Sequence, residues 1–307
     1  MRVAAISNDA TSEFAWPRRA LFAAVASFAF VSAPARAEPA PLPVVASFSI
    51  LGDFVRQIGG AGVEVSVIVG PDGDAHVYEP TPADARKLAA ARLVFVNGLG
   101  FEGWLDRLIA ASKTKATVVV ASRGVAPRNL AGGLDPHAWQ DVANARRYAQ
   151  TIRDALKAAD PARAALYDRN AAAYLAVLDG LDAEVVQAVD AIPKARRRIV
   201  STHDAFGYFA ARYGLEFIAP QGVSTESEAS ARDLARIVDA AKRARVGAVF
   251  LENIVDPRLA TRLAEETGAR LGGPLYSDAL SKPDGPAPSY VEMVRHNLRA
   301  LTRALAD

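Results

Sequence analysis

Three of the four histidines in this chain, together with one aspartate, are the residues best suited to hold a metal ion. His76 lies in a turn rich in glycine and aspartate, and His137 lies in the segment Asp-Pro-His-Ala-Trp. His203 follows the run 198–202, and Asp278 follows another short apolar stretch. Three imidazoles and one carboxylate form a ligand set suited to a borderline divalent ion such as Zn²⁺. More than 60 residues separate successive members, so only a fold can bring them together.

Each of these residues also has a structural interpretation. A single unsupported histidine is usually structural, and an aspartate that follows a serine, as Asp278 does, is typical of a turn or a cap. Glu79 is open to two interpretations, because it can accept a hydrogen bond from the imidazole of His76 or simply begin a loop at Glu-Pro. The fourth histidine, His296, has no acidic or histidine neighbour and is expected at the surface or in packing.

Several neighbours of these residues are expected to support a site without binding metal. Asp135 and Asp204 adjoin two of the histidines and are expected to orient the backbone, and Trp139 is expected to pack against the site. Glu226 and Glu228 precede a predicted helix, where acidic side chains favour the helix dipole.

The elements that must position these residues alternate along the first half of the chain. Short apolar runs bounded by turn residues predict buried strands, and segments with helical spacing lie between them. The predicted strands are 44–50, 63–69, 93–97 and 117–121, and the predicted helices are 51–58, 82–90 and 104–111. This alternation indicates a parallel sheet with helices on both faces.

The middle of the chain predicts one long helix over about 161–189. Apolar residues recur there at helical spacing, and the segment contains no strand signal. Asp160 is expected to be the N-cap and Pro161 the first helical residue, and Pro193 ends the segment. Nearly 30 residues at 1.5 Å each give a rod of about 45 Å, which is far longer than an ordinary crossover helix.

The second half of the chain returns to alternation. Its predicted strands are 199–202, 216–219, 248–251 and 270–272, and its predicted helices are 206–212, 231–243, 258–267 and 289–306. Ligands of such sheets lie beyond the carboxyl ends of the strands. Because His76, His203 and Asp278 follow predicted strands and His137 precedes a helix, each lobe is expected to contribute two ligands. The sequence therefore predicts an α/β protein whose two lobes are joined by one long rigid helix, with a metal site in the cleft between them.

The expected organisation has four parts, which are a signal peptide at 1–37, an N-terminal α/β lobe at 38–158, a linking helix at 159–193 and a C-terminal α/β lobe at 194–307. The first segment has paired arginines, an apolar run too short to span a bilayer, and Ala-Arg-Ala before the expected cleavage site. Sec export and twin-arginine export both remain open.

Composition narrows the class of protein. The chain has no cysteine, so neither a disulfide nor a lipid on an N-terminal cysteine is expected, and the exported protein is predicted to lie free in a periplasm. Its net charge of +2 comes from interleaved basic and acidic residues, which does not indicate a nucleic-acid surface.

Several segments together resemble the periplasmic metal-binding proteins of zinc and manganese ABC importers, the cluster A-I or TroA-like family. The matching segments are His-Val-Tyr-Glu-Pro-Thr-Pro-Ala-Asp (76–84), Asn-Gly-Leu-Gly-Phe-Glu (97–102), Asp-Pro-His-Ala-Trp (135–139), His-Asp-Ala-Phe-Gly-Tyr-Phe (203–209), Gly-Val-Ser-Thr-Glu-Ser-Glu (222–228) and the segment around Asp278. The resemblance covers about 43–307. It implies the same fold of two α/β lobes bridged by a rigid helix.

The resemblance also implies the ligand set His76, His137, His203 and Asp278. Manganese binders of this family usually carry glutamate at the third position and zinc binders usually carry histidine, and this chain has His203 there. Many zinc binders also carry a histidine-rich acidic loop after the first ligand. No other histidine lies between His76 and His137, so that loop is absent.

The expected function is capture of Zn²⁺, as transported ligand, in the periplasm and its delivery to an ABC permease in the inner membrane. A periplasmic metallochaperone is a second candidate partner, and the protein is expected to be a monomer. Manganese or iron binding is the alternative within the same class. A zinc-dependent hydrolase is the alternative from another class, but four protein ligands leave no open position for water, and no HExxH-like motif is present.

Overall fold

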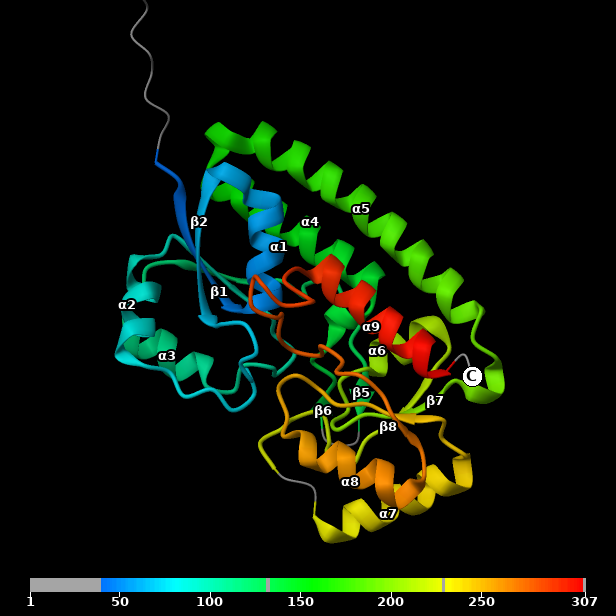
Figure 1. Cartoon of the computed structure of the whole chain (residues 1–307). Coiled ribbons are helices and arrows are strands. Elements are labelled where there is room, and N and C mark those ends of the chain that lie inside the picture. The colour runs from blue at the N-terminus through cyan, green and yellow to red at the C-terminus, as the bar shows by residue number, and fades with distance from the viewer. Residues whose placement is uncertain (1–39, 131–132, 228–229, 306–307) are drawn as a thin grey trace, which may run out of the picture. The chain divides into compact units, whose positions relative to one another are not determined.

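The computed structural model describes residues 40–130, 133–227 and 230–305 (Figure 1). The expected signal peptide at 1–37 and Glu228 lie outside the described residues. Within the part of the chain that the structure describes, no helix is both long enough and apolar enough to cross a membrane.

The first half of the chain forms a four-stranded parallel sheet, as the alternation predicted. Its strands are β1 (Leu42–Phe48), β2 (Val63–Val69), β3 (Leu93–Val96) and β4 (Thr117–Val120), in the order β2-β1-β3-β4. The connecting helices are α1 (Ser49–Gly59), α2 (Pro82–Ala90) and α3 (Leu105–Ser112). β1 and β3 are central and almost wholly buried, because helices cover both faces of the sheet.

The second half forms another four-stranded parallel sheet with shorter strands. These are β7 (Arg198–Val200), β8 (Glu216–Ile218), β9 (Ala248–Val249) and β10 (Arg270–Leu271), in the order β10-β9-β7-β8. The accompanying helices are α6 (Gly207–Tyr213), α7 (Ala231–Ala244), α8 (Pro257–Thr267) and α9 (Tyr290–Leu305). The predicted two-sheet architecture is confirmed, and most predicted bounds differ from the observed ones by only one or two residues.

Two helices connect the sheets. α4 (Val142–Ala159) begins after the small hairpin of β5 (Asn129–Leu130) and β6 (Gly133–Leu134), and α5 (Ala164–Asp190) follows it. Figure 1 shows α5 extending from the part of the fold that holds α1 and α4 to the part that holds α6 and α9. The apolar stripe predicted for this helix is buried at Tyr167, Ala171, Tyr174, Leu178, Leu181, Val185 and Val189.

The predicted start of the long helix is wrong by a few residues. Pro161–Arg163 form a 3₁₀ turn, and the α-helix begins only at Ala164. Asp160 occupies the N-cap position of this turn and Pro161 its first position, as predicted, but the side chain of Asp160 makes no capping hydrogen bond. Its carboxylate accepts hydrogen bonds from the side chain of Arg163 (2.6 Å) and from the hydroxyl of Tyr167 (3.0 Å).

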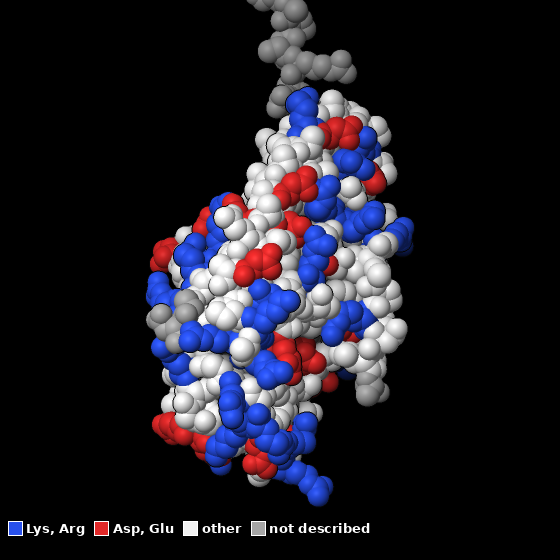
Figure 2. All heavy atoms as spheres, turned by 90° about the vertical axis from the view of Figure 1, so that its right-hand side faces the viewer, with Lys and Arg blue, Asp and Glu red and all other residues white. Residues whose placement is uncertain are grey.

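Exposed ion pairs fasten α5 to the helices of the second half. Arg212 on α6 pairs with Asp182 at 2.6 Å, and Arg295 on α9 pairs with Glu184 at 2.7 Å. Each exposed pair contributes only about 0–1 kcal/mol, so the buried stripe is the main attachment. Figure 2 shows basic and acidic side chains interspersed over this side of the molecule.

Candidate metal centre

The four residues singled out by the sequence lie on four different connections. His76 lies on the loop between β2 and α2, and His137 lies directly before a 3₁₀ turn at Ala138–Gln140. His203 follows β7, and Asp278 lies between β10 and α9. All four are buried, and His76 is the most exposed at 6%.

The fold brings one donor atom of each residue into a cluster whose members all lie within 4.8 Å of one another. His76 Nε2 lies 3.3 Å from His137 Nε2 and 3.2 Å from Asp278 Oδ2. His203 Nε2 also lies 3.2 Å from Asp278 Oδ2. Four ligands held tetrahedrally at zinc–nitrogen bond length would lie about 3.3 Å apart. The residues therefore fit a small four-coordinate ion.

One oxygen of the carboxylate in the cluster has no hydrogen bond. Asp278 Oδ1 is fully enclosed, and His137 Nε2 lies 3.6 Å from it. A buried carboxylate oxygen without a hydrogen bond is costly unless a cation satisfies it. This atom is a second sign that the cluster is built for a cation.

Carboxylates hold the outward-facing nitrogens of two histidines. Asp135 Oδ1 lies 2.9 Å from His137 Nδ1 and also accepts the backbone N–H of His137 at 3.0 Å. Arg128 pairs with the other oxygen of Asp135. Such a carboxylate fixes the tautomer in which Nδ1 carries the proton and Nε2 is free for a metal. The prediction that Asp135 orients backbone is confirmed, but the carboxylate also orients the imidazole.

Glu252 holds His203, and sequence reasoning missed it. Its Oε2 lies 2.6 Å from His203 Nδ1, a close contact that is not aligned as a hydrogen bond. Its Oε1 accepts the backbone N–H groups of Thr202 and His203, both at 2.9 Å. Glu252 lies three residues beyond the end of β9, so its position past the carboxyl end of a parallel strand was the available signal.

The segment after His137 and the segment before Asp278 are tied together. Trp139 Nε1 and Gln140 Nε2 both donate to the carbonyl oxygen of Ser277, at 2.9 and 2.7 Å. All three residues are buried. His137 and Asp278 are therefore positioned by one hydrogen-bonded unit that spans the two halves of the chain. Trp139 has the packing role that was predicted.

Two further buried donors fix the backbone on the side of the first sheet. Trp104 Nε1 donates to the carbonyl oxygen of Ala75 at 2.8 Å, and Asn97 Nδ2 donates to that of Pro136 at 2.9 Å. Each acceptor immediately precedes one of the clustered histidines. Since a buried indole N–H and a buried amide hold these carbonyls, the cluster is preorganised by the core beneath it.

Burial and neighbouring charges set the protonation of the cluster. Burial opposes the charged form of His203, but Glu252 and Asp278 outweigh it and raise the pKa of His203 well above its usual value. Burial likewise opposes the charged form of His137, but Asp278 and Asp135 outweigh it and raise the pKa of His137. Burial also opposes ionisation of Asp278, yet the two imidazoles hold its pKa well below the usual range. A metal ion must therefore displace protons from the histidines.

Two other sequence predictions concern residues near the cluster. Glu79 is exposed, and the structure gives it no contact with the ring of His76, so the loop interpretation is the correct one. The helix α7 begins with Ser230 as its N-cap and Asp233 in its first turn. The acidic residue that favours the helix dipole is therefore Asp233 rather than Glu226.

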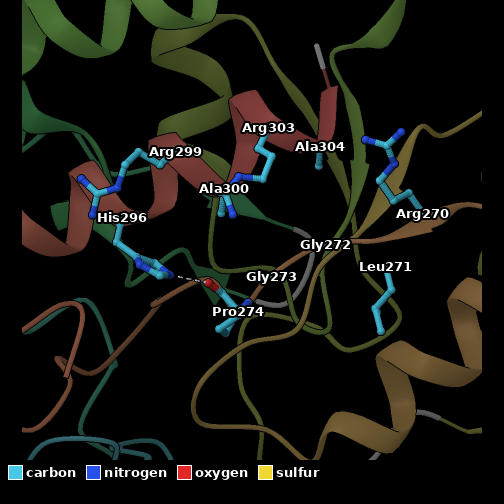
Figure 3. Close-up of a pocket in the computed structure, with 10 residues that line it drawn as sticks. All are labelled: Arg270, Leu271, Gly272, Gly273, Pro274, His296, Arg299, Ala300, Arg303 and Ala304. Carbon is cyan, nitrogen blue, oxygen red and sulfur yellow. Dashed lines mark hydrogen bonds between the residues drawn. The ribbon is translucent and has the colours of Figure 1, made fainter. Parts of the chain in front are cut away.

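A surface hollow of about 320 Å³ lies apart from the cluster, between β10 and α9 (Figure 3). Arg270, Arg299 and Arg303 line it, and Figure 3 shows their guanidinium groups pointing in different directions. His296 Nε2 lies 2.9 Å from the carbonyl oxygen of Pro274, as expected of a packing residue. The hollow therefore presents no convergent set of ligands.

Replacing Glu252 by glutamine is expected to weaken Zn²⁺ binding by about 10- to 100-fold, because the neutral amide holds the tautomer of His203 less firmly and makes its Nε2 a poorer donor. Competition with a fluorescent chelator at pH 7 measures the change. Glu265→Gln, at an exposed position of α8, is the matched control. Unchanged affinity in Glu252→Gln would show that the 2.6 Å contact does not support binding.

Comparison with known proteins gives matches over most of the chain. Residues 44–304 match the family described as "Zinc-uptake complex component A periplasmic" (ZnuA). The manganese-binding lipoprotein MntA of Halalkalibacterium halodurans is 35% identical over 87% of this chain and 89% of its own length. The iron-binding protein YfeA of Yersinia pestis is 32% identical over 94% of this chain and 96% of its own.

A solved structure matches the fold as well. The periplasmic zinc-binding protein TroA of Treponema pallidum superposes with a TM-score of 0.84 and 31% identity, covering 88% of this chain and all of the other. These relatives are named for binding manganese, iron and zinc, and the family consists of substrate-binding proteins rather than enzymes. The chain therefore belongs to the ZnuA family, the TroA-like metal-binding substrate-binding proteins of ABC importers.

Proposed function

We propose that this protein captures Zn²⁺ with His76, His137, His203 and Asp278 and delivers it to an ABC permease. The observation that carries the proposal is the cluster itself, in which three imidazole nitrogens and one carboxylate lie within 4.8 Å of one another. Family membership establishes a metal-binding protein of an ABC importer. The identity of the metal rests on the chemistry of the donors.

The donor set favours zinc over manganese and iron. Nitrogen-rich four-coordinate sites suit Zn²⁺, whereas Mn²⁺ prefers oxygen ligands and six-fold coordination. Here three of the four donors are nitrogen, and Asp135 and Glu252 behind two of them increase their basicity. Manganese or iron is the second candidate, because relatives 32–35% identical to this chain are named for those metals.

The same arrangement suits transport better than catalysis. Four protein donors close a tetrahedral shell, so no position remains for a reacting water. Asp135 and Glu252, two carboxylates that adjoin the cluster, are both engaged by histidine rings. The metal is therefore cargo in this proposal, and binding must be reversible at the permease.

Competitive titration of metal-stripped mature protein tests the choice of metal. Zn²⁺ is expected to bind on the order of a thousandfold more tightly than Mn²⁺, as the affinity order of the divalent ions and the nitrogen donors dictate. X-ray absorption of the zinc-loaded protein is expected to show four light-atom ligands. Comparable affinities for the two ions, or six-fold coordination of zinc, would contradict the proposal.

Location and organisation are part of the same proposal. Export by a cleavable signal peptide at 1–37 would leave lobes at 38–158 and 194–307 joined by the helix at 159–193. Several relatives are named lipoproteins, but this sequence has no cysteine to which such a lipid is attached, so we propose a protein free in the periplasm. It would act as a monomer with an inner-membrane permease and its ATPase, and a metallochaperone is a further candidate partner.

A further inference from the structure

The loop that carries His76 is hydrogen-bonded to the loop between β8 and α7 in the second half of the chain. We infer that Asp74 and Thr225 form a latch between the two halves of the chain that sets the rate at which the metal ion leaves. This inference rests on the proposed role of His76 as a ligand. Asp74 and Thr225 are positioning residues, because they act on the metal only through His76.

One carboxylate makes both connections of the latch. Asp74 Oδ1 accepts the backbone N–H of His76 at 2.9 Å. Asp74 Oδ2 accepts the hydroxyl of Thr225 at 2.6 Å, across 151 residues of sequence. Hydrogen bonds to an ionised carboxylate are stronger than those between neutral groups. The hydroxyl of Thr225 therefore restrains the backbone of His76 through a single side chain.

His76 is the ligand best placed to leave first. Carboxylates hold Nδ1 of His137 and Nδ1 of His203. Among residues 40–130, 133–227 and 230–305, no carboxylate contacts Nδ1 of His76. His76 is also 6% exposed, whereas the other three clustered residues are fully enclosed. Besides the Trp104 bond to the Ala75 carbonyl and the ring of Phe101, which packs on His76 with ring centroids 4.7 Å apart, the latch is a further restraint on His76.

The base of the same loop is attached more firmly than its tip. The backbone N–H of Asp72 donates to the carbonyl oxygen of Leu280 at 2.9 Å, and the N–H of Leu280 donates to Ser49 Oγ at 2.9 Å. Leu280 is buried, so these bonds are protected from water, whereas Thr225 and Asp74 are partly exposed. When the latch opens, Gly73 and Asp74 can move while the base of the loop and the Ala75 carbonyl, which Trp104 holds, stay in place, and the backbone N–H of His76 loses its acceptor.

The latch therefore has a kinetic signature. A metal ion that enters an open site meets no latch, so the association rate depends little on Thr225. A bound ion leaves only after His76 moves, and His76 moves only after the hydroxyl of Thr225 releases Asp74. Loss of that hydroxyl raises the dissociation rate and leaves the association rate nearly unchanged.

Thr225→Val and Thr225→Ser form a matched pair for the test, because valine keeps the shape without the hydroxyl and serine keeps the hydroxyl. Stopped-flow transfer of Zn²⁺ from the loaded full-length mature protein to excess chelator measures the dissociation rate. Thr225→Val is expected to release Zn²⁺ about tenfold faster, as loss of a hydrogen bond to a charged group implies, and Thr225→Ser is expected to stay near the wild-type rate. Melting temperatures of the metal-free variants are expected to be alike.

The outcomes separate the latch from the proposed function. If Thr225→Val releases Zn²⁺ at the wild-type rate while His76→Ala weakens binding, the latch is wrong and the ligand role stands. If His76→Ala binds Zn²⁺ as tightly as wild type, both are wrong. If Thr225→Ser releases the ion as fast as Thr225→Val, the hydroxyl has no gating role. The same conclusion follows if Thr225→Val changes the association rate and the dissociation rate equally.

Discussion

The apparent affinity for Zn²⁺ is expected to fall by about a hundredfold for each pH unit below neutrality, because two imidazolium protons are released for each ion bound. The pKa values of His137 and His203 are both raised in the metal-free protein, mainly because Asp278 and Glu252 outweigh the effect of burial. Below a raised pKa the ring is protonated and cannot bind metal. Competition by protons therefore begins above the ordinary histidine value of about 6.5 and strengthens as the pH falls.

Isothermal titration in buffers of different ionisation enthalpy measures both the affinity and the number of protons released. The same titration of Glu252→Gln provides a comparison. This substitution removes the charge that most raises the pKa of His203, so the fall in Zn²⁺ affinity should move to lower pH. Asp278 remains ionised throughout, since its pKa is held well below the usual range. A flat affinity between pH 7 and 5 would exclude the three-histidine site.

The double variant His203→Glu with Glu252→Gln is expected to lose most of the preference for Zn²⁺ over Mn²⁺. A carboxylate at position 203 replaces a borderline nitrogen donor with a hard oxygen donor, which weakens zinc binding more than manganese binding. The second substitution is needed because His203 Nδ1 lies 2.6 Å from Glu252, where two buried carboxylates would repel each other. We expect the Zn²⁺/Mn²⁺ affinity ratio to fall by about a hundredfold.

Competitive titration of the two ions measures that ratio in the wild type, in the double variant and in His296→Glu. The last variant places the same new carboxylate on α9, where the native ring contacts Pro274 rather than the cluster. Equal ratios in all three proteins would show that His203 is not a ligand. A reduced ratio in His296→Glu as well would point to a general effect of charge.

The strand and helix pattern was predictable because it depends on local spacing. Buried parallel strands such as β1 and β3 are short apolar runs, and the stripe from Tyr167 to Val189 repeats every three or four residues along α5. The start of α5 was not predictable from Asp160 and Pro161. The hydrogen bonds that the Asp160 carboxylate makes depend on the position of Tyr167, whose hydroxyl donates to it.

The sequence by itself predicted the four candidate donors and their approximate places. His76, His203 and Asp278 follow strands, and His137 precedes a helix, so their chemistry and topology could be stated before any coordinates. Their side chains converge only because the two separate sheets pack in one particular relative arrangement. No periodicity within either half specifies that packing.

Only the tertiary structure decided which groups support the donors. Glu252 lies 49 residues from His203, Trp139 lies 138 residues from Ser277, and Thr225 lies 151 residues from Asp74. A glutamate after a short strand or a threonine in a loop has no local pattern that marks a partner so far along the chain. These contacts arise when loops from different strands meet at the carboxyl edges of the two sheets. Apolar spacing fixes the elements, whereas the packing of the two halves fixes the hydrogen bonds that hold each imidazole in place.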